Sequence, residues 1–189
     1  MTFGVDQLEA LAECVELINT GRATSGRAAG AGDRLAGLDD VIAFGRRHRV
    51  ENLGAARARD VARLRELRAR LDSVAIACQV GDESAAIRGL NALLAETGAV
   101  PQIVSHDGRP PHIHVTRAAA PLADRIAAHS AMGLAELVVA GAGSRVRTCA
   151  SPRCDAVFID LSRNCLRLIS FSRFRMSFNS FRRSPEPRT

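Results

Sequence analysis

With 189 residues, of which 47% are hydrophobic and 24% charged, the chain has the composition of a globular protein, which excludes the disordered and fibrous classes. It contains no apolar run of about 18 residues, and acidic residues interrupt residues 6–16, so we expect no membrane span and no signal peptide and predict a cytoplasmic location. The net charge of +6 is uneven: residues 1–144 hold 16 Arg and 17 acidic residues, whereas residues 145–189 hold 10 Arg and 3 acidic residues.

The first predicted element is an amphipathic helix over residues 5–19, because apolar residues recur at helical spacing with acidic residues on the opposite face. Asn19 is expected to cap its C-terminus, and it is also a candidate contact for a small ligand. A loop rich in small residues follows over residues 21–32. Asp39 is then predicted to cap a short helix that ends near Arg47.

Two longer helices are predicted next, over residues 55–79 and 83–96, because their apolar residues keep the i, i+3, i+4, i+7 pattern. Asp82 is expected to cap the second of them. Cys14 and Cys78 fall within helical patterns, which indicates small core residues in place of reactive thiols.

A β-hairpin is predicted near residues 102–116, because two short strand-like runs flank the turn dipeptide Asp107-Gly108. His112 and His114 are two residues apart and therefore lie on one face of their strand, where they are candidate ligand-binding residues. A metal ion could also use them, with His106 as a third ligand. A half-exposed polar face is the competing interpretation.

A last helix is predicted from Pro121 to about residue 140, and the glycines at 141 and 143 end it. Composition and charge change at this point, which predicts a domain boundary. We therefore expect a mainly α fold of the α+β class: a helical domain with one hairpin over residues 1–143, a small module over residues 144–167, and a basic tail over residues 168–189.

The small module carries Cys149 and Cys154 on either side of the tight turn A-S-P-R. Two thiolates presented by a turn between strands are typical of half a structural zinc site. Buried or disulfide-linked cysteines are the alternative, but a disulfide is less expected in a reducing compartment. The pattern therefore favours a metal site without completing it.

The run C-A-S-P-R-C-D-A-V-F-I-D-L-S-R-N resembles the opening of the CGNR zinc finger, the C-terminal module of bacterial proteins regarded as stress-induced transcription regulators. Residues of about 8–140 resemble the ABATE domain of the same proteins, notably in E-L-I-N-T at Glu16–Thr20 and P-P-H-I-H-V at Pro110–Val115. In that family a second cysteine pair follows S-R-N and ends in Cys-Gly-Asn-Arg. This chain has no such tetrapeptide after Asn164 and supplies Cys165 alone.

The resemblance implies a structural Zn²⁺ held by Cys149 and Cys154, with Cys165 as a candidate third ligand and the site weak or incomplete. A module of this size has little core of its own and commonly gains its stability from metal binding. The charge asymmetry independently predicts a polyanionic partner, because clustered arginines neutralise phosphates.

The leading hypothesis is therefore a DNA-binding transcription regulator in which Arg145, Arg147, Arg153 and Arg163 face phosphate. Phenylalanines and arginines alternate in the tail after residue 168, which would also suit contact with nucleic acid. The alternative is a sensor that binds a small-molecule effector near Asn19 and the hairpin histidines. A metal hydrolase lacks a motif such as H-E-x-x-H and a positioned acid or base, so we do not expect an enzyme.

Overall fold

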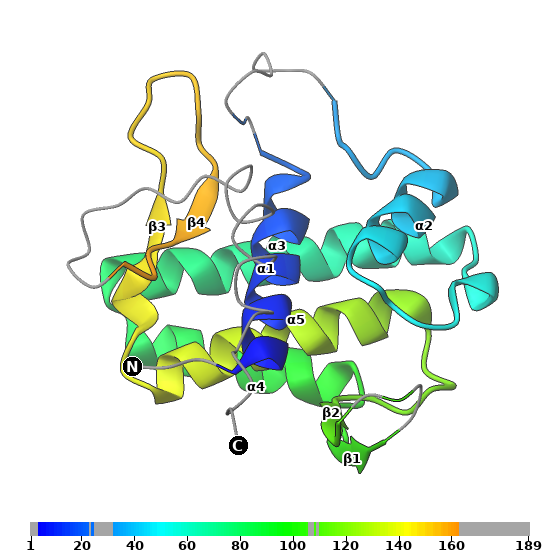
Figure 1. Cartoon of the computed structure of the whole chain (residues 1–189). Helices are drawn as coiled ribbons and strands as arrows, with labels where there is room; N and C mark the ends of the chain where they lie inside the picture. The colour runs from blue at the N-terminus through cyan, green and yellow to red at the C-terminus, as the bar shows by residue number, and fades with distance from the viewer. Residues whose placement is uncertain (1–3, 23, 25–31, 106–107, 109, 163–189) are drawn as a thin grey trace, which may run out of the picture.

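The computed structural model describes residues 4–22, 24, 32–105, 108 and 110–162, and within these ranges it is mainly helical with two small antiparallel hairpins, which confirms the predicted fold class. The elements in chain order are α1 (Val5–Asn19), α2 (Leu38–Arg47), a 3₁₀ turn η1 (Leu53–Ala55), α3 (Arg59–Val80), α4 (Glu83–Glu96), β1 (Gln102–Val104), β2 (His112–His114), α5 (Leu122–Val139), η2 (Gly143–Arg145), β3 (Val146–Thr148) and β4 (Val157–Ile159). Figure 1 shows their arrangement.

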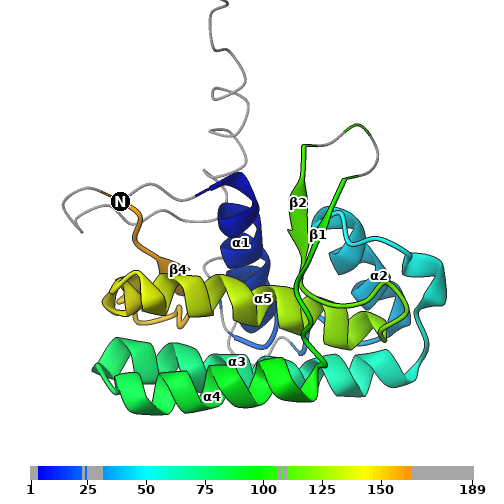
Figure 2. The same cartoon turned by 90° about the horizontal axis from the view of Figure 1, so that it is seen from below.

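Helices α3, α4 and α5 run side by side, and α1 crosses them (Figures 1 and 2). The core between them consists of fully buried aliphatic side chains, among them Leu17, Leu64, Leu67, Leu71 and Leu134. Burying a leucine side chain contributes roughly 1.5–3 kcal/mol, so these side chains supply much of the folding free energy. The crossing of α1 over this layer places the two hairpins on different sides of α1.

Most predicted helices are confirmed within a few residues, and the local capping explains the differences. Asp82 caps α4 as predicted, since its carboxylate accepts a 2.9 Å hydrogen bond from the N–H of Ala85. The predicted role of Asp39 is wrong. Helix α2 begins at Leu38 with Gly37 as its N-cap residue, two residues before the predicted cap, and the carboxylate of Asp40 accepts from the N–H of Gly37, which satisfies a donor at the helix start.

Helix α3 begins later than the predicted residue 55, because η1 and an extended residue at Ala56 precede it. Asp60 fixes this start. Its buried carboxylate accepts hydrogen bonds from the N–H of Arg57 at 2.7 Å and from the N–H of Ala123 in α5 at 3.2 Å. One side chain therefore joins the first turns of α3 and α5.

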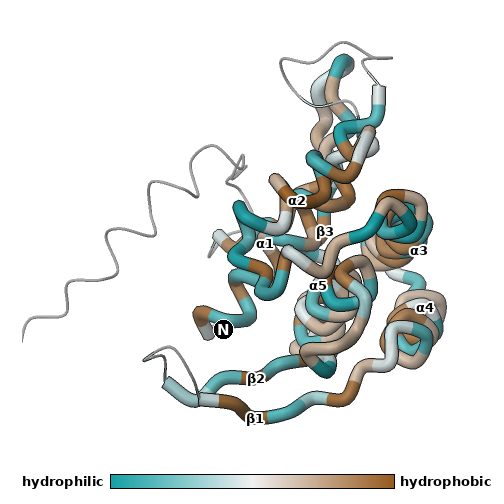
Figure 3. Tube along the Cα trace, turned by 90° about the vertical axis from the view of Figure 1, so that its right-hand side faces the viewer, coloured by the Kyte–Doolittle hydropathy of each residue, from teal (hydrophilic) through white to brown (hydrophobic). Residues whose placement is uncertain are grey.

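The first hairpin pairs β1 with β2 in the register Gln102↔His114, Ile103↔Ile113 and Val104↔His112. It extends away from the helices (Figure 3). His112 is buried, His114 is half-buried, and Ile113 between them is exposed, which confirms that the two histidines share the inner face. Asp107 of the predicted turn lies outside the described residues.

The second hairpin pairs β3 with β4, with Val146 opposite Ile159 and Thr148 opposite Val157. Val146, Val157 and Ile159 are buried in the same hydrophobic cluster as the helices. The first strands of the small module thus complete the core of the helical body. None of the helices in the described ranges combines the length and apolar character that crossing a bilayer requires.

Candidate functional sites

The β3–β4 hairpin holds Cys149 and Cys154 at the two ends of its turn. The N–H of Cys149 donates to the carbonyl of Ala156 at 2.8 Å, which continues the ladder one residue beyond β3. The N–H of Cys154 donates to the carbonyl of Ser151 at 3.0 Å and closes the turn. Cys149 is half-buried, Cys154 is buried, and neither forms a disulfide. The backbone therefore presents two free thiols from one tight turn.

Two thiolates are the donor type that Zn²⁺ prefers in structural sites, and they are half of the usual set of four. Among the described residues, no group of three or more His, Cys, Asp or Glu side chains is placed to hold a metal ion. The predicted third ligand, Cys165, lies outside those residues, as does His106. The part of the hairpin that is described therefore fits one half of a zinc site.

The other two described cysteines belong to the core, as predicted. Cys14 and Cys78 are almost fully buried in α1 and α3. Burial raises the pKa of both thiols, which suppresses the thiolate form that binds metal or attacks an electrophile. Their role is packing.

Asn19 joins the helical body to this hairpin. Its side-chain amide donates to the carbonyl of Val157 and its amide oxygen accepts from the N–H of Val157, both at 2.8 Å. A neighbouring strand would offer the edge of β4 the same donor and acceptor. Asn19 is the last residue of α1, and Thr20 is the C-cap residue in place of the predicted Asn19.

Further contacts hold the hairpin against α1 and α3. Arg22 donates to the carbonyl of Asp155 at 2.7 Å and pairs with Asp72 of α3 at 2.6 Å. The hydroxyl of Thr148 donates to the side-chain oxygen of Gln79 at 2.8 Å. The turn that carries the cysteines is therefore fixed on a rigid support.

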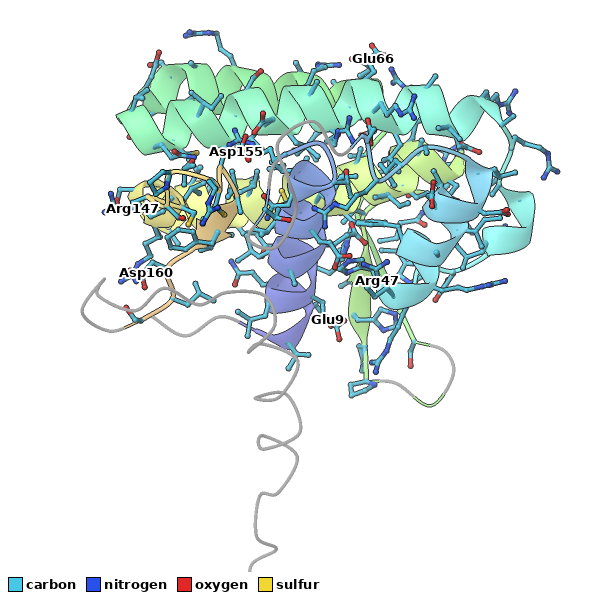
Figure 4. The ribbon with its side chains drawn as sticks, turned by 90° about the horizontal axis from the view of Figure 1, so that it is seen from above. Glu9, Arg47, Glu66, Arg147, Asp155 and Asp160 are labelled. Atoms are coloured by element: carbon cyan, nitrogen blue, oxygen red, sulfur yellow. The ribbon has the colours of Figure 1, made fainter. Side chains whose placement is uncertain are left out.

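The predicted DNA-binding arginines differ in their surroundings. Arg145 donates to the carbonyls of Asp160 and Ser162 at 2.8 and 2.9 Å, so it closes the open end of the hairpin. Arg147 and Arg153 are exposed. Figure 4 shows Arg147, Asp155 and Asp160 at one end of the molecule. Arg163 lies outside the described residues.

Asp160 follows β4 and is buried. The hydroxyl of Ser162 donates to its carboxylate at 2.6 Å, and the N–H of Ser162 donates at 3.0 Å. These bonds, with Arg145 and Arg147 nearby, lower the pKa of Asp160 although burial opposes the shift. The carboxylate therefore stays charged and fixes the end of the hairpin.

A second candidate site is a cleft of about 140 Å³ between α1, β2 and α5. Five parts of the chain line it: helix α1, the segment 48–51 after α2, strand β2, the segment 115–118 after it, and helix α5. All the histidines that the structure describes contribute to its walls, namely His48, His112, His114 and His129. The cleft therefore contains both hairpin histidines that the sequence marks as ligand candidates, whereas Asn19 faces β4.

Carboxylates that the sequence pattern misses contact these histidines. Glu13 accepts from the hydroxyl of Ser130 at 3.0 Å and lies 3.2 Å from His129 Nδ1. Glu16 pairs with Arg47 and lies 3.0 Å from His48 Nε2. The prediction that the acidic residues of the first helix face solvent is wrong for Glu13 and Glu16, which are buried. Their basic partners come from distant segments, so no local spacing reveals them.

The pKa of Glu16 is lowered even though burial alone would raise it, because His48, Arg47 and Arg34 stabilise the carboxylate. For His129, burial disfavours the charged ring, but the pKa is raised above its usual value of 6.5, because Glu13, Glu9 and Asp6 favour the imidazolium. The folded state therefore holds this proton more tightly than the unfolded state.

This shift predicts a pH dependence of stability. A group whose pKa is raised by folding contributes its full stabilisation below its unfolded pKa, here about 6.5, and loses it as the pH rises through the folded pKa. We expect the free energy of unfolding to fall above pH 6.5, and His129→Gln to remove that part of the decline. Urea denaturation followed by circular dichroism between pH 6 and pH 9 measures both. An equally steep decline in the two proteins would contradict the assignment.

Two family models match successive parts of the chain. Residues 11–141 match the ABATE family model, described as "Putative stress-induced transcription regulator", and residues 145–168 match the CGNR zinc finger. Both are regulator or zinc-finger families and neither is an enzyme family. No curated protein matches the chain. Because the first model covers well over half of the 189 residues, the chain belongs to the ABATE family, and its β3–β4 hairpin lies within the region that matches the CGNR zinc finger.

Proposed function

We propose that the protein is a DNA-binding transcription regulator that presents the turn of its β3–β4 hairpin to the phosphate backbone. The observation that carries this proposal is the exposure of Arg147 and Arg153 on a hairpin whose base is buried in the helical body. Phosphate contacts need exposed guanidinium groups on a backbone that is held in place by packing. The hairpin offers both.

The arginines of the helical body are used differently. At least six of them pair with carboxylates: Arg22, Arg47, Arg63, Arg65, Arg68 and Arg70. Such pairing cancels their charge locally, which agrees with the near-zero net charge of residues 1–144. The excess positive charge therefore lies in residues 145–189, the part of the sequence that favours contact with a polyanion.

Zinc would have a structural role in this proposal. Cys149 and Cys154 would be two of its ligands, with Cys165 as a third, and the ion would supply a cross-link that fixes the turn. The contacts of Asn19, Arg22 and Thr148 already position the strands on either side of that turn. We keep the division into residues 1–143, 144–167 and 168–189 as part of the proposal, together with a cytoplasmic location, where DNA is accessible.

One observation favours an additional sensor role for the helical domain. Strand β2, which lines the histidine cleft, and the β3–β4 hairpin lie on different sides of α1 (Figures 1 and 2), so a ligand could occupy the cleft without blocking DNA. A regulator of this kind would combine an effector site and a DNA site in one chain.

DNA binding is tested by a salt titration of the full chain with duplex DNA. The logarithm of the affinity falls with the logarithm of the salt concentration by roughly 0.9 per phosphate contact. We expect the double substitution Arg147→Ala/Arg153→Ala to weaken binding and to flatten this slope by about 2. Fluorescence anisotropy of a labelled duplex at several salt concentrations gives both quantities.

The matched control is Arg59→Ala/Arg88→Ala, which removes the same charge from exposed positions in α3 and α4. Arg47 is a poorer control because it pairs with Glu16. The control should leave the slope nearly unchanged. An equal loss in both double variants, or an unchanged slope in the hairpin variant, would refute DNA binding through this hairpin.

A further inference from the structure

We propose that His112 and His114 form a divalent transition-metal site in the cleft, with Glu51 as the third protein ligand. This site is separate from the cysteine turn, and the two lie on different sides of α1. The proposal names the class of effector that the cleft would take. It holds or fails independently of DNA binding.

The first argument is the distance between the two imidazole rings. His112 Nε2 and His114 Nε2 face each other at 3.2 Å. In a tetrahedral site with metal–nitrogen bonds of about 2.0–2.1 Å, two ligand nitrogens are about 3.3 Å apart. The two nitrogens are therefore already separated by nearly the distance that a shared ion requires.

The second argument is the protonation of His112. Its Nδ1 lies 3.0 Å from the carbonyl of Pro110, and a carbonyl can only accept a hydrogen bond. His112 Nδ1–H therefore donates to this carbonyl, and Nε2 is the ring nitrogen on the side of His114. Metal-bound histidines commonly donate the other ring N–H to a backbone carbonyl in this way, which fixes the ring and its tautomer. Nε2 of each ring would then bind the ion in place of their present 3.2 Å contact.

Glu51 supplies the third ligand. Its Oε1 lies 3.7 Å from His114 Nε2, and its side chain is 45% exposed. A rotation of this side chain would bring the carboxylate to the ion. Within the described ranges no group of three ligands is placed ready for a metal, and this rotation is the change that binding requires. Water would fill the remaining position, as in open zinc sites.

The electrostatics and the donor set agree with a cation of this class. Four carboxylates line the cleft, Asp6, Glu9, Glu13 and Glu51, against two guanidinium groups, Arg49 and Arg125. Imidazole with carboxylate suits Zn²⁺, Co²⁺, Ni²⁺ and Cu²⁺, whereas Mg²⁺ and Ca²⁺ prefer oxygen ligands alone.

The test uses the full chain with Cys149, Cys154 and Cys165 changed to serine, so that no thiolate of the hairpin region competes. Titration with Co²⁺, followed by calorimetry and visible absorption, should show one ion per chain without a sulfur charge-transfer band. His114→Gln should weaken binding at least tenfold, and Glu51→Gln should also weaken it. The same triple-serine background carries every variant.

Glu83→Gln is the matched control for Glu51→Gln, because Glu83 is an exposed carboxylate at the start of α4 and does not line the cleft. It should leave Co²⁺ affinity unchanged. Since His112 is buried, the half-buried His114 is the principal variant, and its circular dichroism spectrum should match that of its parent. Failure of the triple-serine chain to bind Co²⁺, or equal affinity in the His114→Gln variant, would overturn the proposal. A loss of DNA affinity alone would bear on the hairpin and not on this site.

Discussion

Replacing Asn19 by alanine is expected to lower the free energy of unfolding by about 2–4 kcal/mol. The substitution removes two buried hydrogen bonds and leaves both the N–H and the carbonyl of Val157 without the partner that now satisfies them. Each buried polar group left unsatisfied costs about 1–3 kcal/mol. For a chain of this length the loss corresponds to a fall in the melting temperature of roughly 5–15 °C. Thermal and urea denaturation followed by circular dichroism measure it, since the chain has no Trp or Tyr.

Two controls separate the lost bonds from a general effect of the substitution. Asn91→Ala changes an exposed asparagine within α4 and should alter stability by less than about 0.5 kcal/mol. Asn19→Asp keeps the acceptor for the Val157 N–H but loses the donor for its carbonyl, so it should also destabilise the protein. If Asn19→Ala unfolds at the same urea concentration as the parent chain, the amide does not hold β4 in solution.

The second large effect is expected at Gly133, where α5 crosses α1. A Cβ atom at this position would lie 2.8 Å from the Cβ of Ala10 and 3.1 Å from backbone atoms of Ala10 and Leu11. Backbone cannot move aside as the tip of a side chain can, so the helices would have to separate. Overpacking of this kind costs about 1–3 kcal/mol. The higher helix propensity of alanine offsets up to about 1 kcal/mol of this cost. We expect a net loss of about 1–2 kcal/mol for Gly133→Ala and a larger loss for Gly133→Val.

Gly89 provides the comparison within the same protein. A Cβ there would lie 2.6 Å from Val74 Cγ2, which is a side-chain atom that can move with its rotamer. Gly89→Ala should therefore change the free energy of unfolding by less than about 0.5 kcal/mol, because the gain in helix propensity offsets the adjustment. Equal losses at Gly89 and Gly133 in urea denaturation would show that the α1–α5 crossing is not the tight contact described here.

The sequence predicts the helices well because their information is local. Apolar periodicity and the cap at Asp82 place α4 at its observed bounds, Glu83–Glu96. The start of α3 is mispredicted because Asp60 takes its second partner from α5, which lies 63 positions away. The Asp39 prediction fails for a smaller reason: Asp39 and Asp40 are adjacent, and only the backbone geometry decides which carboxylate reaches the N–H of Gly37.

The candidate sites, too, are predictable only where their residues lie close together in the sequence. The cysteine turn and the shared face of His112 and His114 are evident from spacing, because each pair lies within one turn or one strand. The carboxylates beside the histidines are not evident, since Glu13 and Glu16 meet partners 116 and 32 positions away. Asn19 looks like an ordinary helix end, and its bonds to Val157 span 138 positions. Long-range partners of polar residues leave no periodic trace in a single sequence.

Helix α1 touches both candidate sites. Glu13 faces the cleft and Asn19 holds β4, and the six positions that separate them correspond to only about 9 Å along the helix. Thermodynamic linkage then requires that any effect of one site on the other be reciprocal. If a ligand in the cleft shifts α1 and thereby alters zinc affinity at the hairpin by some factor, zinc at the hairpin must alter the affinity of the cleft by the same factor. Measuring either ligand in the presence and absence of the other would give a single coupling free energy, and that quantity would state how strongly the cleft and the hairpin are coupled through α1.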